Sequence, residues 1–246
     1  MIVTITINPA LDKSLVVEKL IPDKKLRCSN PTIEAGGGGI NISKALQQSG
    51  GKSIAIFPSG GLNSNSLTQI LETQNIAFKS IPVVNKTREN FIVTESSANA
   101  QYRFVMPGNF LNNDEIEAYI TAITWANPSP TIIVASSSLP PGVPDNFFAR
   151  LAMVAKRIGA KYIVDTSGNP LKIAAREGVH FLNPNLSELC SLVEKDYLQL
   201  DEVNAAAQDV IKKAHCKVMV VSMGPAGTML VTVNENERIP ALLLKN

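Results

Sequence analysis

Four consecutive glycines, Gly36 to Gly39, stand directly before Ile40-Asn41 and an apolar pattern with helical spacing. Glycine loses the most backbone entropy on ordering, so such a run is poorly suited to the interior of a strand or helix. It suits a sharp turn where a ligand approaches the backbone. Because a helix N-terminus with free N–H groups follows, the run predicts a loop that binds a polar or anionic group. A tight turn before an ordinary helix explains the same residues.

The glycine run matches neither of two known phosphate-binding motifs. Gly-Lys-Ser/Thr does not follow it as in a Walker A loop, and Asn41 stands where the last glycine of G-x-G-x-x-G would be. A hydrolase triad also lacks support, because the chain has no Gly-x-Ser-x-Gly and we assign no role to His180 or His215.

Polar residues follow several predicted strands. Asp12 comes just past an N-terminal strand, Ser138 follows a later one and Asp165 ends the next; Asn185 follows another strand, and Ser222 stands at the end of one more. Ligands of open α/β sheets bind beyond the carboxyl ends of strands. We therefore expect these residues to mark one functional edge, although a single Asp at a strand end is commonly structural.

Asn185 and Glu188 open a predicted helix and allow two interpretations. Asn at the N-cap with Glu three residues later is related to a capping box. The same pair could face a hydrated Mg²⁺ and the phosphates it binds. The two roles are compatible.

Four basic residues fall on segments predicted to form a flap of short strands: Lys25, Arg27, Arg88 and Arg103. They can be solvated surface charges. Arginines on a flap over a glycine-rich turn are also suited to bidentate capture of phosphate.

Strands and helices alternate along the chain, which predicts an α/β fold with a mainly parallel sheet covered on both faces. The expected core strands are 2–7, 52–57, 77–84, 131–136, 161–165, 179–182, 217–223 and 227–233. The expected helices start near 40 and cover 63–74, 114–125, 145–158, 171–177, 186–194 and 203–213. Flap strands are expected at 14–20, near 32, at 88–95 and at 101–106.

The overall composition excludes several classes of protein. A net charge of +2 argues against a nucleic-acid binder that relies on broad electrostatics. The three cysteines are scattered without a CxxC pair, which indicates reduced thiols in a cytoplasm. The first residues alternate as in a strand and lack a basic signal-peptide region, and no apolar run is long enough to cross a bilayer.

A set of motifs recurs in family order along the whole chain: Asn8-Pro9-Ala10-Leu11-Asp12, Lys25-Leu26-Arg27, Gly36 to Asn41, Tyr102 to Gly108, Ser138-Leu139-Pro140-Pro141-Gly142, Asn183-Pro184-Asn185 with Glu188, and Val221 to Gly227. On these motifs the chain resembles the phosphofructokinase-B sugar kinases of the ribokinase-like fold. Type II 6-phosphofructokinases are most similar, because the glycine run contains no lysine; tagatose-6-phosphate and fructose-1-phosphate kinases come next.

The resemblance implies a three-layer ribokinase-like domain over residues 1–246, with a small lid of strands at about 13–34 and 87–107. It implies ATP-dependent phosphorylation of a ketohexose phosphate, with fructose 6-phosphate first and tagatose 6-phosphate or fructose 1-phosphate as alternatives. Asp12, Gly37, Gly38 and Asn41 would bind the sugar hydroxyls, and Ser138 would lie beside the sugar. Arg88 would bind the sugar's phosphate with Arg103 nearby, and Lys25 and Arg27 would reach it from the partner of a lid-mediated homodimer. Asn185, Ser222, Gly224, Pro225 and Gly227 would line the ATP site, and Asn185 and Glu188 would hold Mg²⁺ through water.

The chain departs from the family pattern in one respect. The family's Gly-Ala-Gly-Asp segment, which supplies the anion hole and the catalytic base, does not occur before Asn246. We therefore expect a C-terminally incomplete kinase that has no catalytic base and is inactive in this form. The alternative of another class is a non-catalytic sugar-phosphate-binding module; a dinucleotide-dependent oxidoreductase fits less well.

Overall fold

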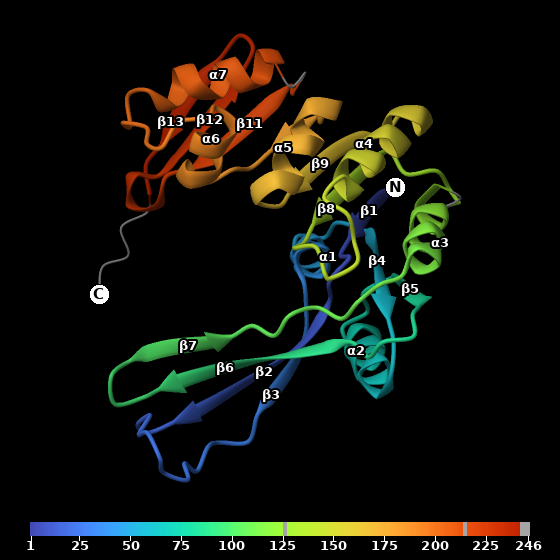
Figure 1. Cartoon of the computed structure of the whole chain (residues 1–246), viewed down its shortest axis with the longest axis vertical. Coiled ribbons are helices and arrows are strands. Elements are labelled where there is room, and N and C mark those ends of the chain that lie inside the picture. Colours follow the sequence, from blue (N-terminus) through green and yellow to red (C-terminus); the bar gives the residue numbers. More distant parts are fainter. Residues whose placement is uncertain (125–126, 214–215, 242–246) are drawn as a thin grey trace. The chain divides into compact units, whose positions relative to one another are not determined.

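The computed structural model describes residues 1–124, 127–213 and 216–241, and its elements alternate between strands and helices (Figure 1). The strands are β1 (Ile2–Ile5), β2 (Ala10–Val17), β3 (Thr32–Gly36), β4 (Ser53–Ser59), β5 (Phe78–Pro82), β6 (Arg88–Glu95), β7 (Ala100–Phe104), β8 (Ile132–Ser136), β9 (Lys161–Asp165), β10 (Phe181–Leu182), β11 (Val218–Ser222), β12 (Thr228–Thr232) and β13 (Asn236–Ile239). The helices are α1 (Gly38–Gln48), α2 (Leu62–Thr73), α3 (Asn113–Thr124), α4 (Phe147–Ile158), α5 (Gly168–Glu177), α6 (Leu186–Leu192), α7 (Val203–Lys213) and the 3₁₀ turn η1 (Gly224–Ala226).

The described residues divide into two compact units. The N-terminal unit comprises Thr4–Ile123 and Leu139–Val143, and the C-terminal unit comprises Met1–Val3, Thr124–Ser138 and Pro144–Asn246. The expected end of the third helix at Trp125 lies outside the described residues. None of the helices in the described part of the chain has the length and apolar character of a membrane span.

The N-terminal unit contains a small mixed sheet with the strand order β3-β2-β6-β7, which we call the lid sheet. β2 pairs with β3 antiparallel and with β6 in parallel, and β6 pairs with β7 antiparallel. β2 begins earlier than expected, at Ala10, immediately after Pro9. Asp12 therefore lies inside a lid strand, and its expected position just past the first core strand is wrong.

The register of the lid sheet sorts its side chains onto two faces. Paired residues point to the same face, and successive residues along a strand alternate between faces. The polar lid face carries Asp12, Ser14, Thr32, Glu34, Arg88, Asn90, Thr94, Gln101 and Arg103, together with the apolar residues Ala10, Val16 and Ile92. The apolar lid face carries Leu11, Leu15, Val17, Ile33, Ala35, Phe91, Val93, Tyr102 and Phe104, together with the charged side chains Lys13, Glu89 and Glu95. Strand pairing alone therefore puts Asp12, Arg88 and Asn90 on the same face of the sheet.

The glycine run is not the open loop that the sequence predicts. Gly36 is the last residue of β3 and Gly38 is the first of α1, so Gly37 alone joins strand to helix, with φ of 123°. Such a φ strongly favours glycine. Gly39 lies so close to β1 that an added Cβ would meet the main-chain oxygen of Ile5. Part of the run therefore serves close packing of α1 on the sheet.

The inner end of the lid sheet is anchored to the rest of the N-terminal unit by α2, which packs against β2 and β3. Leu11 and Ala35 join a buried cluster that also contains Ile40, Ala55, Phe57, Leu67, Leu71 and Ile76. This cluster fixes the position of the strands that carry Asp12 and Gly36.

Truncation inside this cluster should destabilise the N-terminal unit. Leu71 is fully buried, and Leu71→Ala should lower the free energy of unfolding by about 2–5 kcal/mol through lost burial and a residual cavity. Leu62, on the same helix, is 87% exposed, so Leu62→Ala is a matched control expected to change little. Urea titration of the two variants measures the difference, and equal midpoints would contradict the packing described.

The C-terminal unit contains a sheet segment in the order β8-β9-β10-β11-β12-β13 (Figure 1). The first four strands are parallel, and β12 and β13 continue antiparallel. The expected α/β fold with a mainly parallel sheet is confirmed. The sequence did not predict β13, because its residues are all exposed and carry no apolar alternation.

The three thiols lie in different environments. Cys28 is exposed, whereas Cys190 and Cys216 are buried, and burial raises the pKa of Cys216 to about 11. We expect Ellman's reagent to titrate one thiol in the native chain and three after unfolding. The folded state favours the neutral form of the Cys216 thiol. The resulting contribution to the stability of the folded state is complete below the pKa of the thiol in the unfolded chain, about 8.5, and is lost as the pH rises toward 11. Rapid native reaction of all three thiols would contradict this burial.

Candidate functional site

A carboxylate on the lid sheet lies directly over the glycine run. Asp12 is on β2, paired with Glu34 on β3, and a Cβ added to Gly36, two residues along β3, would clash with the Asp12 carboxylate. Asn90, paired with Asp12 in the β2–β6 ladder, donates from Nδ2 to Asp12 Oδ1 at 2.8 Å. Glycine at position 36 therefore makes room for an oriented carboxylate, a suitable acceptor for hydroxyl groups.

Arg88 is held in place beside this carboxylate. Its Nη1 donates to the Met106 carbonyl at 2.7 Å and its Nη2 donates to the Asn8 carbonyl at 3.1 Å. Burial lowers the pKa of Arg88, and the negative charge of Asp12 partly opposes that shift. Its buried Nε has no hydrogen-bond partner among the described residues. A fixed, half-buried guanidinium with donors to spare suits a phosphate group.

A small cavity beside Arg88 is lined by Asn8, Lys86 and Pro140 among others, and its volume is about 20 Å³. That is room for about one water molecule. This cavity is therefore too small to hold a sugar phosphate.

The remaining sugar-binding candidates of the N-terminal unit lie at the start of α1. Gly37 and Gly38 are half-buried, and Asn41 is exposed one turn into the helix, with its N–H donating to the Gly37 carbonyl at 2.9 Å. The Thr6 hydroxyl accepts the Ile40 N–H at 3.0 Å. The helix start is therefore anchored from below while its outer residues stay accessible.

The other basic candidates are not gathered around Asp12. Lys25 and Arg27 are exposed in the β2–β3 connection, which is tied to the far end of β2 where the Ser29 N–H donates to the Val16 carbonyl. Val16 lies four positions beyond Asp12 along the strand, a span of roughly 13 Å. Arg103 shares the polar lid face but donates from Nε to Gln101. Within this chain, Arg88 alone of the four neighbours Asp12 in the described structure.

In the C-terminal unit, polar residues follow neighbouring parallel strands. Ser136 at the end of β8 donates to the Asp165 carboxylate at the end of β9, at 2.8 Å. Asn185 follows β10 and forms a parallel bridge with Ser222 at the end of β11. Ser138 is exposed two residues after β8. Polar residues therefore follow the carboxyl ends of four neighbouring parallel strands, as the sequence predicts; their function stays a prediction.

Asn185 and Glu188 form a complete capping box. The Asn185 side chain accepts the Glu188 N–H and Glu188 Oε2 accepts the Asn185 N–H, both at 2.9 Å. The structural interpretation of this pair is therefore confirmed. Glu188 Oε1 is not part of the box, so the side chain can also face a second partner.

The residues Gly224, Pro225 and Gly227 form a tight turn after β11. Gly224 and Gly227 have φ of 59° and 92°, and Gly227 N–H donates to the Gly224 carbonyl at 3.0 Å. An added Cβ on Gly227 would meet the Ile239 carbonyl of β13. The turn is therefore held against β13, a strand that the sequence did not reveal.

The acidic residues near this edge suit a magnesium ion held mainly through water. In the described part of the chain, no group of three or more His, Cys, Asp or Glu residues could hold a metal directly. Mg²⁺ keeps several waters and commonly uses one or two carboxylates together with substrate phosphates. Glu188, with one carboxylate oxygen outside the capping box, fits that mode.

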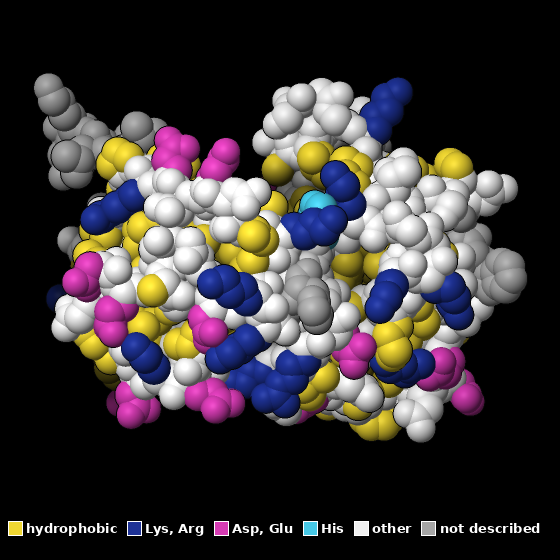
Figure 2. Space-filling view, turned by 90° about the horizontal axis from the view of Figure 1, so that it is seen from above, with side chains coloured by type: hydrophobic (Ala, Val, Ile, Leu, Met, Phe, Trp, Pro, Cys, Tyr) yellow, Lys and Arg dark blue, Asp and Glu magenta, His cyan; other side chains and the backbone are white. Residues whose placement is uncertain are grey.

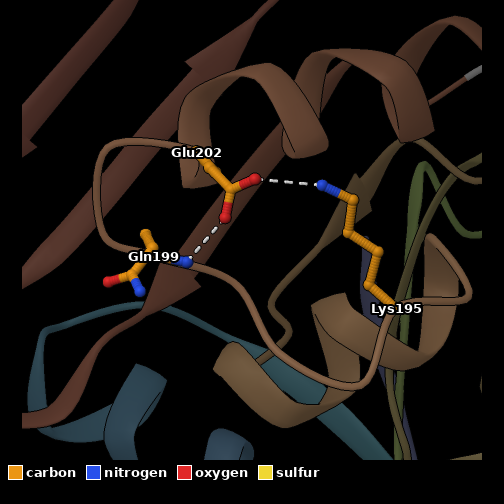
Figure 3. A network of polar contacts seen from close by, with 3 residues as sticks. All are labelled: Lys195, Gln199 and Glu202. Atoms are coloured by element: carbon orange, nitrogen blue, oxygen red, sulfur yellow. Dashed lines mark hydrogen bonds and ion pairs between the residues drawn. The ribbon is translucent and has the colours of Figure 1, made fainter.

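A second glutamate of the unit, Glu202, also accepts a main-chain N–H from three residues earlier. Glu202 accepts the Gln199 N–H at 2.8 Å and the Lys195 ammonium at 3.1 Å (Figure 3). These two contacts, the amide first, lower the pKa of Glu202. These contacts lie directly before α7 and stabilise the turn that precedes it. Glu202 is therefore a matched control for Glu188.

His180 is not placed for catalysis. Burial lowers its pKa first, followed by the positive charges of Lys161 and Lys217. In the space-filling view, a His side chain in cyan is bordered by Lys and Arg side chains in dark blue (Figure 2). It precedes β10, at the strand ends opposite to those carrying Asp165 and Ser222.

Sequence reasoning missed one residue of the N-terminal unit, Asn90. A signal was available, because Asn90 stands two residues after Arg88 in a predicted strand and must share its face. The pairing of β6 with β2, which brings Asn90 opposite Asp12, could not be read from the sequence.

Comparisons with known proteins show which family the chain resembles along its length. Residues 4–244 match the family described as pfkB family carbohydrate kinase. An ATP-dependent 6-phosphofructokinase isozyme 2 from Mycobacterium tuberculosis is 38% identical over 98% of this chain and 71% of its own length. The protein of the same name from Escherichia coli is 38% identical over 93% of this chain and 74% of its own length.

A solved structure is similar across nearly the whole chain. The crystal structure of phosphofructokinase-2 from Escherichia coli in complex with fructose-6-phosphate matches with a TM-score of 0.94 and 36% identity, covering 99% of this chain and 80% of that one. The fold is therefore ribokinase-like, with a mainly parallel central sheet and a smaller sheet. The chain belongs to the pfkB family of carbohydrate kinases.

Proposed function

We propose that this chain binds fructose 6-phosphate and ATP, and that it belongs to an enzyme that transfers the γ-phosphoryl group to the free C1 hydroxyl of the sugar. The observation that carries the proposal is the joint placement of Asp12 and Arg88 on the polar lid face. Asp12 would accept hydrogen bonds from sugar hydroxyls, together with Gly37, Gly38 and Asn41. Arg88 would bind the 6-phosphate, with Arg103 farther along the same face, and Ser138 would lie beside the sugar.

The nucleotide would bind at the carboxyl ends of the strands in the C-terminal unit. Asn185, Ser222, Gly224, Pro225 and Gly227 would line its site, and Asn185 and Glu188 would hold Mg²⁺ through water. Bound Mg²⁺ would supply charge neutralisation to the phosphates during transfer. The lid sheet would exclude water, which otherwise competes with the sugar as acceptor.

A second function is favoured by one specific observation, the absence of Gly-Ala-Gly-Asp from the 246 residues. Phosphoryl transfer needs a residue that accepts the proton of the attacking hydroxyl. Asp12 would be engaged with the sugar, Asp165 accepts from Ser136, and Glu188 is part of a capping box. We propose that these 246 residues bind the sugar phosphate without transferring phosphate to it.

One sample can test both proposals. Calorimetry with fructose 6-phosphate, tagatose 6-phosphate and fructose 1-phosphate measures binding, and a coupled assay of ADP release measures turnover. Binding of fructose 6-phosphate ahead of the other two supports the assignment of substrate. Failure to bind any of them overturns it, and turnover by the 246 residues overturns the second proposal alone.

The apolar lid face would pair with a second copy of the chain in a cytoplasmic homodimer. Ile33, Tyr102 and Phe104 share this face and are exposed. Large apolar side chains gathered on one face commonly mark an interface. Lys25 and Arg27, distant from Asp12 in their own chain, would then reach the partner's sugar site.

Light scattering should report a dimer, and Phe104→Glu should shift it toward monomer; an unchanged mass would contradict this interface.

A further inference from the structure

We infer that Asn90 is a positioning residue for the sugar site: it orients the Asp12 carboxylate and ties it to the end of the lid strand β7. This inference rests on the proposed function, because it assigns a role to a residue that acts through Asp12. Asn90 lies between Arg88 and Ile92 on the polar lid face and would itself make no contact with the nucleotide.

Both halves of the Asn90 amide are engaged. Nδ2 donates to Asp12 Oδ1 at 2.8 Å, and Oδ1 accepts the Met106 N–H at 3.1 Å. An ionised carboxylate only accepts hydrogen bonds and a main-chain N–H only donates. A single orientation of the amide therefore satisfies both neighbours, and rotation by half a turn would break both contacts.

The second contact links the site to the lid. Met106 lies two residues after the end of β7, and its peptide groups are bound twice: Asn90 accepts its N–H, and Arg88 donates to its carbonyl at 2.7 Å. The two residues expected to serve the sugar, Asp12 and Arg88, are thus fixed to the same stretch of main chain. Asn90 completes that connection on the Asp12 side.

The chemistry explains why an amide is required. With no donor beside it, the Asp12 carboxylate could rotate toward water and lose its alignment with the sugar hydroxyls. Loss of a hydrogen bond to a charged group in a binding site corresponds to about a 10- to 100-fold loss of affinity. Asp at position 90 would keep the acceptor for Met106 but would place a second carboxylate against Asp12.

The experiment compares Asn90→Asp and Asn90→Ala, with Thr94→Ala as the control on the same strand and face. Calorimetry measures the affinity for fructose 6-phosphate, and the ³¹P line width measures the weak binding of inorganic phosphate. Amide hydrogen exchange at Met106 reports the lid contact, and melting temperatures report folding. Asn90→Ala is also combined with Asp12→Ala.

We expect both Asn90 variants to lose about 10- to 100-fold in affinity for fructose 6-phosphate, while Thr94→Ala is unchanged. Met106 should stay protected in Asn90→Asp and exchange faster in Asn90→Ala. Inorganic phosphate should bind as before, and Asn90→Ala should cause no further loss once Asp12 is alanine. This non-additivity is a result that a purely structural role would not produce.

Two results would overturn the inference: Asn90→Asp binding the sugar phosphate like the unsubstituted chain, or independent, additive losses from Asp12 and Asn90. If Asn90→Asp fails to fold, the Asn90→Ala and Asp12→Ala pair still decides between these outcomes. If the unsubstituted chain binds no fructose 6-phosphate, the proposed function itself fails, which is distinguishable from failure of the positioning role.

Discussion

Replacing Arg88 by alanine should weaken the binding of fructose 6-phosphate by roughly 100-fold, because truncating one partner of a buried charge pair costs about 2–5 kcal/mol and about 1.4 kcal/mol is tenfold. Arg88 is fixed by the carbonyls of Met106 and Asn8, so its remaining donors are oriented before the ligand arrives. Calorimetry with fructose 6-phosphate and with fructose measures the loss. Affinity for fructose, which lacks the phosphate, should fall much less.

Two further variants make the Arg88 experiment specific. Lysine at position 88 should recover only part of the affinity, because an ammonium cannot hold both carbonyls and a phosphate in a fixed fork. Arg238→Ala removes an equal charge from the exposed strand β13 and should leave sugar binding unchanged. Full recovery by lysine, or an equal loss in Arg238→Ala, would show that net charge and not geometry attracts the phosphate.

Replacing Glu188 by glutamine should reduce the Mg²⁺-dependent affinity for a non-hydrolysable ATP analogue by about 10- to 100-fold, the usual effect of losing a group that orients a bound metal. The Gln amide oxygen can still accept the Asn185 N–H, so the capping box and the melting temperature should be retained. Titration with and without Mg²⁺ separates metal-dependent from metal-independent binding.

Glu202→Gln provides the matched control for Glu188. Glu202 makes the same contact with a main-chain N–H three residues earlier, but its other carboxylate oxygen accepts from Lys195. Its substitution should leave nucleotide binding unchanged. If Glu188→Gln binds the analogue normally, the capping box is the whole role of Glu188 and the proposed magnesium site is wrong.

Much of the C-terminal unit could be predicted from the sequence. β9 and α7 have the predicted bounds, 161–165 and 203–213. Buried parallel strands read as short β-branched runs, and amphipathic helices show their own period, so local pattern suffices there. The Asn185–Glu188 capping box was equally readable, because both partners lie within four residues of each other.

The errors concern features set by pairing between distant segments. Gly36 reads as a loop residue, yet it ends a strand because Ala10 pairs with it. Asp12 reads as following a core strand, yet β2 starts at Ala10 and pairs with β6, nearly eighty residues later. β13 has no apolar pattern and is recruited by main-chain hydrogen bonds to β12. Asn90 lies opposite Asp12 only because of the same long-range pairing of β2 with β6.

The attachment of the lid sheet to α2 has a consequence for local stability. Buried apolar contacts with α2 are made at the inner end, by Leu11 and Ala35, while Ile33, Tyr102 and Phe104 farther out are exposed. The free energy of local opening should therefore fall from the inner end of the lid sheet, near α2, toward its outer end. In a single chain, the Asp12 carboxylate and the Arg88 guanidinium would thus lie at the inner end, where amide exchange is slow. The outer end would become rigid only when another surface covers it.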